Sequence, residues 1–478
     1  MMRRPQWLAA TALAAALLSA CAPLPRALPE NAAVALPAQW SSAAGTTPGT
    51  NADTSAALTS DWWTQLGDAQ LNRLVQQALA QNTEILTAAA RVQEAQANLA
   101  ATDAARSPQL NATLGASAGR SLTVLGPSQS RSAQPGLQAS WELDLWGRLS
   151  QQSQAAAARV QASEADRAAV QLSVAATTVQ TYVGLRALQQ QLAISQATVQ
   201  SRDKALQLAN DQVRVGYSSQ LQLTQAQAEY EAVQQQVLQL QWQIDKQLTT
   251  LNLLLGQAGG NAQLLAASTG QLQDLPLPAV PASLPSQLLE RRPDIARAAA
   301  LLAASDHQMQ AQRAAFLPQV SLSASVGSLL VNALDYNPLT VWSLGGSLLA
   351  PLFNGGRLQA QLDAATAQRD QAAYGYRGAV LNAFADVEGA LTGTQRLAQQ
   401  TQHATQRREV LKKSLGLAHD RYEAGYASYL EELDAQRNLY AAELEVVRLH
   451  QAELDNRVQL YKALGGGWQH AAQNVAKP

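Results

Sequence analysis

The 478-residue chain has little charge, few aromatic side chains and a single cysteine. Only 14% of its residues are charged, against roughly 25% in a typical globular chain, and three are Phe. One cysteine excludes both an intrachain disulfide and a metal site built from several cysteines. A net charge of −1 provides no basic surface, so no nucleic-acid partner is expected. The scarcity of aromatic anchors argues against the three ordinary domains that the length would suggest.

Motifs that carry catalysis are also missing. The patterns HExxH, GxGxxG and the P-loop do not occur. The five histidines are scattered, at His307, His403, His419, His450 and His470. Three methionines cannot form a ladder of soft metal ligands. The sequence therefore predicts a protein that is not an enzyme and holds no metal or cofactor, with His403 and His419 solvated on a helix.

What the chain does have begins with an export signal at residues 1–20. Two arginines precede an apolar stretch at 7–18, which is too short to span a membrane. The stretch ends in the lipobox LSAC, whose cysteine, Cys21, is the only one in the chain. We expect an N-acyl diglyceride and palmitate on Cys21, and, because Ala22 rather than Asp follows it, sorting to the outer membrane. The alternative is ordinary cleavage near an alanine, which would leave a spare thiol.

The rest of the chain repeats itself at a spacing of 210 residues, which becomes 209 further on. The matching pairs are Glu84-Ile85 and Asp294-Ile295, Pro108 and Pro318, Gly147-Arg148-Leu149 and Gly356-Arg357-Leu358, Gly216-Tyr217 and Gly425-Tyr426, and Leu255-Gly256 and Leu464-Gly465. So long a period indicates a duplicated domain. We predict a first repeat at 61–275 and a second at 276–468, between an acylated tether at 21–60 and a C-terminal tail at 469–478.

Each repeat contains two segments in which apolar and polar residues alternate. They lie at about 109–118 and 136–145 in the first repeat, and at about 319–328 and 340–352 in the second. Each has about the length of a tilted transmembrane strand. The polar face of one segment carries Glu142 and Asp144, which favours a water-filled barrel lumen over a packed core. The alternative is a pair of soluble amphipathic hairpins.

Four such strands cannot close a barrel by themselves. A sheet in lipid must close, because open edges leave unpaired backbone groups. Two chains would give eight strands and an interior filled by side chains, whereas three would give 12 strands and a passage. The pattern therefore favours a homotrimer.

Long helices account for most of each repeat. We predict a first helix near 62–105 and near 285–315, followed after the strands by helical hairpins at about 148–255 and 357–464. A stretch without proline from 148 to 214 would make a helix roughly 100 Å long. Apolar residues recur every seven positions, as in a coiled coil, in the rows Leu223, Tyr230, Val237, Ile244 and Leu251, and Leu433, Tyr440, Val447, Leu454 and Tyr461. Glycine and serine in the turns near 216 and 425 suit a left-handed helix exit and an N-cap.

Several motifs together resemble the outer-membrane factors of tripartite efflux systems. They include WELDLWGR from Trp141, RRPDI from Arg291, LFNGGR from Leu352 and LGGGW from Leu464. The chain is similar to the lipidated OprM/NodT branch and more distantly to TolC, over roughly residues 60–470. The resemblance implies a mainly α fold with a membrane β part, in which a trimeric 12-stranded β-barrel continues into a 12-helix periplasmic α-barrel. It also implies an outer-membrane location with a lipid anchor on the periplasmic side, and as partners a periplasmic adaptor (membrane fusion protein) and an inner-membrane pump.

The resemblance also suggests which residues form the periplasmic gate. Glu431 and Asp434 match acidic positions at the closed aperture of the family, Leu430 could add a hydrophobic ring, and Tyr422 matches a residue that ties neighbouring helices together. Gln222 occupies a position where TolC has an acid, so the network must differ from that of TolC. The simpler alternative for the two acids is favourable charge near a helix N-terminus.

The helical turns are the expected contacts with the adaptor, at Gly216, Tyr217, Gly425 and Tyr426, although simple helix reversal would also explain these residues. The predicted function is passive exit of small toxic compounds or drugs from the pump to the exterior. A type I secretion duct and a coiled-coil lipoprotein scaffold are the alternatives. The transported compounds are not encoded here, because selectivity resides largely in the pump.

Overall fold

The computed structural model describes residues 29–34, 37, 40, 59–124, 126–260, 271–280, 288–331 and 338–468. The signal peptide, Cys21 and the tail at 469–478 lie outside these residues. The chain divides into two compact units. The first consists of Met1–Val34, Gln93–Ala162 and Ala298–Gly378, and the second of Ala35–Val92, Ser163–Arg297 and Ala379–Pro478. Each unit therefore takes segments from both sequence repeats.

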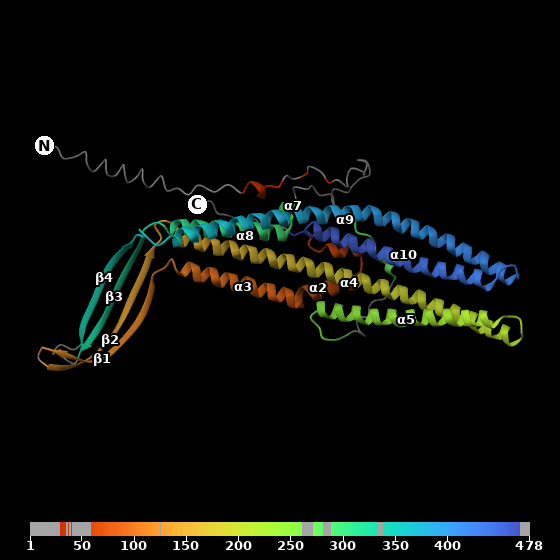
Figure 1. Ribbon diagram of the computed structural model, residues 1–478, viewed down its shortest axis with the longest axis horizontal. Coiled ribbons are helices and arrows are strands. Elements are labelled where there is room, and N and C mark those ends of the chain that lie inside the picture. Colours follow the sequence, from red (N-terminus) through yellow and green to blue (C-terminus); the bar gives the residue numbers. More distant parts are fainter. Residues whose placement is uncertain are drawn as a thin grey trace. The chain divides into compact units, whose positions relative to one another are not determined.

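The first unit contains one antiparallel sheet of four strands, seen side by side in Figure 1. The strands are β1 (Gln109–Thr123), β2 (Gly126–Leu143), β3 (Gln319–Val331) and β4 (Leu339–Leu349), in the spatial order β1-β2-β3-β4. Pairing of β2 with β3 joins the hairpins of the two repeats into one sheet. Within the chain, β1 and β4 are the two edges.

The register of the sheet separates apolar from polar side chains. Residues that face each other across strands share one side of a sheet. One row across the four strands is Ala112, Leu137, Val326 and Trp342, and the next is Asn111, Gln138, Ser325 and Ser343. Hydroxyl pairs link neighbouring strands on the polar side, with Oγ–Oγ distances of 2.8 Å for Ser117–Ser132 and Ser325–Ser343. The predicted alternation is therefore confirmed over most of the sheet as one apolar and one polar face, although Leu329 and Leu339 pair on the polar side.

The strand ends differ from those predicted. β1 and β2 continue to the turn near Val124, because polar residues go on pairing beyond 118 and before 136. At the other end β2 stops at Leu143 and not at 145. Here the Asp144 carboxylate accepts from the backbone N–H groups of Leu149 (2.9 Å) and Ser150 (2.7 Å), and so starts the next helix. β4 ends at Leu349, short of the predicted 352.

Two helical hairpins make up most of the chain. α4 (Arg148–Arg214) returns as α5 (Gln220–Leu254), and α9 (Arg357–Glu423) returns as α10 (Tyr429–Ala463), as Figure 1 shows. The two long helices have 67 residues each and the two return helices 35 each. The predicted heptad rows are largely buried, including Val237, Ile244 and Leu251 in α5 and Leu433, Val447 and Leu454 in α10. Across the described residues, no helix combines the length and the apolar character needed to cross a membrane.

The predicted helix near 62–105 is broken into three pieces. These are η3 (Trp62–Leu66), α2 (Ala69–Gln81) and α3 (Thr83–Ala104). The Asp68 side chain accepts from the N–H groups of Gln70 and Leu71 and thereby starts α2. Asn82 ends α2, and its Oδ1 accepts from Glu84 N at 2.9 Å to start α3. These caps satisfy N–H groups that a helix start leaves unpaired.

The second repeat breaks at the matching place. α7 (Leu288–Arg291) stops before α8 (Pro293–Ala314), because proline is accepted at the first position of a helix but disfavours a helical residue before it. In both repeats the side chain at the break donates to a carbonyl at the end of a return helix. Asn82 Nδ2 donates to Leu254 O and Arg292 Nη1 donates to Ala463 O, both at 3.0 Å. The duplication is thus preserved in geometry although the residue types differ.

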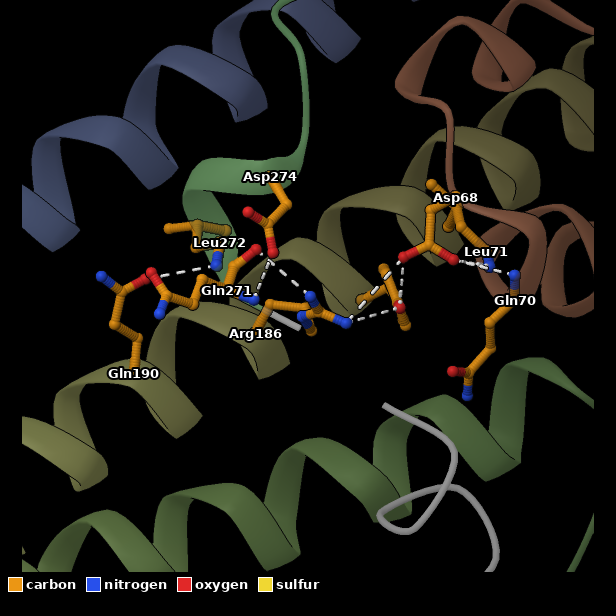
Figure 2. Close-up of polar contacts among 9 residues, drawn as sticks. Asp68, Gln70, Leu71, Arg186, Gln190, Gln271, Leu272 and Asp274 are labelled. Carbon is orange, nitrogen blue, oxygen red and sulfur yellow. Dashed lines mark hydrogen bonds and ion pairs between the residues drawn. The ribbon is translucent and has the colours of Figure 1, made fainter. Parts of the chain in front are cut away.

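Four aromatic residues pack together in the core of the second unit. The Trp62 ring stacks on that of Tyr461 with centroids 5.5 Å apart, and Trp63 and Tyr182 are buried with them. Next to this core, Arg186 of α4 joins two chain segments (Figure 2). Its guanidinium lies 3.9 Å from the Asp68 carboxylate and donates to Gln271 O at 3.2 Å. The partners of this largely buried cation are the N-cap residues of α2 and of η4 (Leu272–Asp274), so Arg186 fixes the start of both segments on α4.

Candidate functional site

The turn of each helical hairpin is built by the same backbone motif. Gly216 and Gly425 adopt the left-handed conformation, with φ of 79° and 78°. The N–H of the next residue reaches back five residues: Tyr217 N donates to Gln212 O and Tyr426 N to Arg421 O, both at 2.8 Å. This hydrogen-bond pattern closes a helix at a left-handed glycine. The predicted role of the two glycines in helix reversal is confirmed.

The turns also expose large side chains. Tyr217 and Tyr426 are 89% and 81% exposed. The Ser219 side chain accepts from Gln222 N at 3.3 Å and caps α5 as predicted, whereas Ser428 makes no such side-chain bond at the start of α10. Both tyrosines thus lie in hydrogen-bonded turns with their side chains exposed.

The two predicted gate acids lie on the surface of the first turns of α10. Glu431 Oε1 accepts from Arg421 Nη1 at 2.8 Å, and its side chain is 43% exposed. The Asp434 side chain is 68% exposed, 3.8 Å from Arg437. Leu430, between them and the turn, is half exposed. The three side chains are therefore accessible at this end of the hairpin.

Tyr422 contacts Gln222, the residue that departs from TolC. The Gln222 side chain donates from Nε2 to the Tyr422 hydroxyl at 3.0 Å, and its Oε1 accepts from Ser218 Oγ at 2.7 Å. The Tyr422 ring lies 5.9 Å from that of Tyr429. An amide thus joins the two helical hairpins here through a hydrogen bond to Tyr422.

A larger polar network next to the two predicted gate acids was missed by sequence reasoning. Glu432 is buried, and its Oε1 contacts His419 Nδ1 and accepts from Gln436 Nε2, each at 3.0 Å. The preceding residue, Glu431, is exposed. Two consecutive glutamates of α10 therefore differ, one carboxylate being buried and the other in solvent. His403 and His419 are both exposed, as expected, and His419 also takes part in this network through its contact with Glu432.

The same network includes a buried arginine. Arg202 of α4 lies 3.8 Å from Glu229 of α5 and donates to Gln436. Glu229 in turn accepts from Arg437 of α10, and that hydrogen bond lowers the pKa of Glu229. The hydrogen bond to Glu432 raises the pKa of His419. Four helices are thus linked by alternating charges directly behind the exposed acids.

The predicted lumen residues lie at the junction between sheet and helix in the first unit. Glu142, on the polar face of β2, accepts two hydrogen bonds from Arg148 Nη2, at 2.7 and 2.8 Å. Asp144 lies just beyond β2 and caps α4. Trp146 Nε1 donates to Pro318 O at 2.7 Å and links the two repeats. Much of the WELDLWGR motif therefore has a structural role at this junction.

No cluster of three or more side chains able to hold a metal ion occurs among the described residues. The predicted lipidation site, Cys21, lies outside them.

Comparison with known proteins gives these features a context. The model of the outer membrane efflux protein family matches residues 74–257 and 284–466. The chain belongs to this family. The pyoverdine export outer membrane protein OpmQ of Pseudomonas aeruginosa is 36% identical over 470 residues, 96% of this chain and 97% of that protein. The probable outer membrane lipoprotein SilC of Salmonella typhimurium is 31% identical over 85% of this chain and 88% of its own. The crystal structure of the open outer membrane channel MtrE of Neisseria gonorrhoeae superposes with a TM-score of 0.80 at 27% identity, covering 94% of this chain and 98% of that one.

Family membership confirms the main predictions made from the sequence. This outer membrane efflux protein is a channel of tripartite efflux systems in the outer membrane, and it is not an enzyme. Its mainly helical fold, with two strand hairpins and two long helical hairpins, is the TolC-like fold.

Proposed function

We propose that three copies of this chain form one continuous duct across the outer membrane. The observation that carries the proposal is the sheet register, which places most large apolar side chains of the strands on one face and leaves β1 and β4 as edges. In lipid these edges must pair, and β1 of one copy can pair with β4 of the next. Three sheets then close into a barrel of 12 strands whose polar face, including Glu142, and the adjoining Asp144 line the lumen.

In the duct, the exposed ends of the helical hairpins form the periplasmic gate. Each copy contributes Glu431 and Asp434, so six carboxylates gather around the threefold axis. Such a ring repels anions and attracts cations. Leu430 adds a ring of apolar side chains, and Tyr422 holds the two hairpins together through Gln222. Arg421, which binds Glu431, restrains this ring in the closed channel.

Planar-bilayer recording tests both the duct and its gate. We expect the purified wild-type trimer to give a small single-channel current. The double variant Glu431→Ala with Asp434→Ala should give a larger current, because the ion pairs between these carboxylates and their arginine partners no longer hold the aperture closed. Glu445→Ala is a matched control, since Glu445 also lies on α10 with an arginine three residues on, at 3.8 Å. A wild-type protein that neither forms trimers nor conducts would refute the duct. A double variant with unchanged current would remove the two acids from the gate.

The partners follow from the same arrangement. We propose that the exposed turns at Gly216-Tyr217 and Gly425-Tyr426 meet a periplasmic adaptor, which couples the duct to an inner-membrane pump. The cargo is small solutes expelled by that pump, and the likeness to OpmQ makes pyoverdine a first compound to assay. Deletion of the gene should increase susceptibility to toxic pump substrates or retain such an exported compound in the periplasm.

A further inference from the structure

Two arginines lie on the apolar face of the sheet. Leu110 pairs with Ala139, and Ala118 pairs with Arg131, so even-numbered positions of β1 and odd-numbered positions of β2 share this face. Arg120 therefore also lies there, opposite Gln129. Within the four strands as described, these two arginines are the only charged residues on the apolar face. Glu142, the third charged residue of the strands, is on the polar face.

Both arginines lie at the same level, toward the hairpin turn and away from the helices. Arg131 is opposite Ala118, and Arg120 is two residues further along β1, so the two are diagonal neighbours. Diagonal neighbours in a sheet are about 7–8 Å apart at their Cα atoms, within reach of two long side chains. A tilted strand crosses the hydrocarbon core in about 9–11 residues. Counted from Leu110, at the helical end of β1, this span ends at Arg120.

The surroundings of this pair match a phosphorylated lipid. Both side chains are exposed. Guanidinium binds phosphate through paired hydrogen bonds, better than a point charge would. On the membrane side of the pair, Ala116 and Ala118 are small, and Leu114 is 77% exposed, which gives acyl chains an apolar surface to cover.

We propose that Arg120 and Arg131 bind the phosphate groups of the phosphorylated glycolipid of the outer leaflet. This assignment rests on the proposed duct, in which the strand turns point outward and the helices lie in the periplasm. The acyl chains of the bound lipid run along β1 and β2 toward Leu114 and Leu137. The second hairpin has Leu330 where the first has Arg120, so each chain carries one site and a trimer three.

Lipid that remains bound during purification provides the test. Full-length trimer is extracted from outer membranes in mild detergent, and bound 3-hydroxy fatty acids and phospholipid are counted per trimer by mass spectrometry. We expect Arg120→Gln with Arg131→Gln to lower the bound glycolipid by about fivefold or more, because two charge-assisted contacts are lost. Arg106→Gln, an exposed arginine at the helical end of the sheet, is the matched control and should leave the amount unchanged. Arg120→Lys with Arg131→Lys keeps the charge and should retain most of the lipid.

The source of the phosphate is resolved by adding lipids to delipidated trimer. Diphosphoryl lipid A should bind to the wild type and not to the glutamine variant. Phosphatidylglycerol should bind to both proteins in the same amount. The proposal would be overturned if the wild type and the glutamine variant carried equal amounts of glycolipid, or if Arg106→Gln lost as much glycolipid as the glutamine variant. It would also be overturned if phosphatidylglycerol replaced the bound glycolipid. Bilayer current is recorded in parallel. Normal current with lost glycolipid supports the lipid site and leaves the duct intact, whereas absence of current in the wild type refutes the duct alone.

Discussion

At the scale of single residues, Asp455 of α10 is a carboxylate with little support. Its Oδ2 accepts from Gln451 Nε2 at a long 3.4 Å, and its Oδ1 has no hydrogen-bond partner among the described residues. Burial raises the pKa of Asp455 to about 6. At neutral pH the folded protein therefore holds an ionised group in surroundings that favour the neutral acid.

Asparagine at this position should stabilise the protein at neutral pH. The folded-state pKa of Asp455 lies above the usual value, so its contribution to stability is complete below about pH 4 and is lost as the pH rises to about 6. We expect Asp455→Asn to raise the free energy of unfolding at pH 7.5 by roughly 1–3 kcal/mol and to leave it nearly unchanged at pH 4, since two pKa units correspond to about 3 kcal/mol. Denaturation of the full protein at both pH values measures this.

The exposed acid Asp245 on α5 is the control, because Asp245→Asn should have no such effect. If the Asp455 variant lost stability between pH 4 and 7.5 as the wild type does, the carboxylate would not be the titrating group.

Sequence reasoning found the exposed residues of the site but not the buried ones. Gly216 and Gly425 were identifiable because a left-handed turn between heptad rows requires glycine. Arg202, Glu229 and Glu432 were not, because their roles depend on which faces of four helices meet. Glu432 and Glu431 have the same side chain and differ only in the direction that one residue of helix rotation gives them. A glutamate beside a heptad position was the one available signal.

At the scale of helices, the two hairpins share a close contact between a glycine and an amide. Gln247 of α5 lies over Gly184 of α4 and donates from Nε2 to Thr181 O at 2.8 Å. In the second hairpin, Asn456 of α10 lies over Gly393 of α9 and donates to Ala390 O at 2.9 Å. A Cβ on Gly184 would meet Gln247 Nε2 at 2.8 Å. The glycines thus make room for polar side chains that join long and return helices.

Alanine at the second of these glycines should therefore weaken the hairpin. In Gly393→Ala the new methyl group would collide with the Asn456 amide, whose hydrogen bonds to Ala390 O and Thr394 Oγ1 must then break. We expect a loss of about 1–3 kcal/mol in the free energy of unfolding, typical of overpacking. Gly389→Ala, one turn earlier on α9, meets open space and should be neutral or stabilising by up to about 1 kcal/mol. Two variants of equal stability would show that the contact is unimportant.

The periodicity of apolar residues in the sequence predicted the helices and strands correctly. The residues at which they end, however, depend on single polar side chains. The alternation near β2 continues through Asp144, and only the bonds from its carboxylate to Leu149 and Ser150 show that the strand has already ended. The helical pattern likewise runs across Asn82, where the side chain caps a new helix. Asparagine and aspartate can end one element or continue another with little change in pattern, so the sequence left these boundaries open.

At the scale of the whole molecule, lipid attachment and channel assembly are separable. The lipobox predicts acylation at Cys21, whereas the strand register concerns residues 109–349. The likeness to SilC, named a probable outer membrane lipoprotein, supports acylation. One site of acylation adds membrane affinity, but a barrel of paired strands inserts independently of it.

The acyl chain should therefore be dispensable for the trimer. In cells given labelled palmitate, we expect the wild type to carry label and Cys21→Ala to carry none, while the trimer of the variant still forms and conducts. Cys21→Ser is a second control that keeps the size of the side chain. Undiminished labelling of the variants would disprove the assignment of Cys21, and loss of the trimer would show that anchoring and assembly are coupled.

The strand register also governs where the chain can change length. Deleting one residue of β1 between Leu114 and the turn would move Asn111 and Thr113 to the apolar face and Leu110 and Leu114 to the polar face, if the turn keeps its pairing. The two repeats differ by one residue between Pro108 and Gly147, yet Leu110 and its counterpart Val320 both lie on the apolar face. Such a difference is therefore absorbed at the turn near Val124, which is fully exposed. This turn is the place in the first hairpin where an epitope tag can be inserted without reversing either strand.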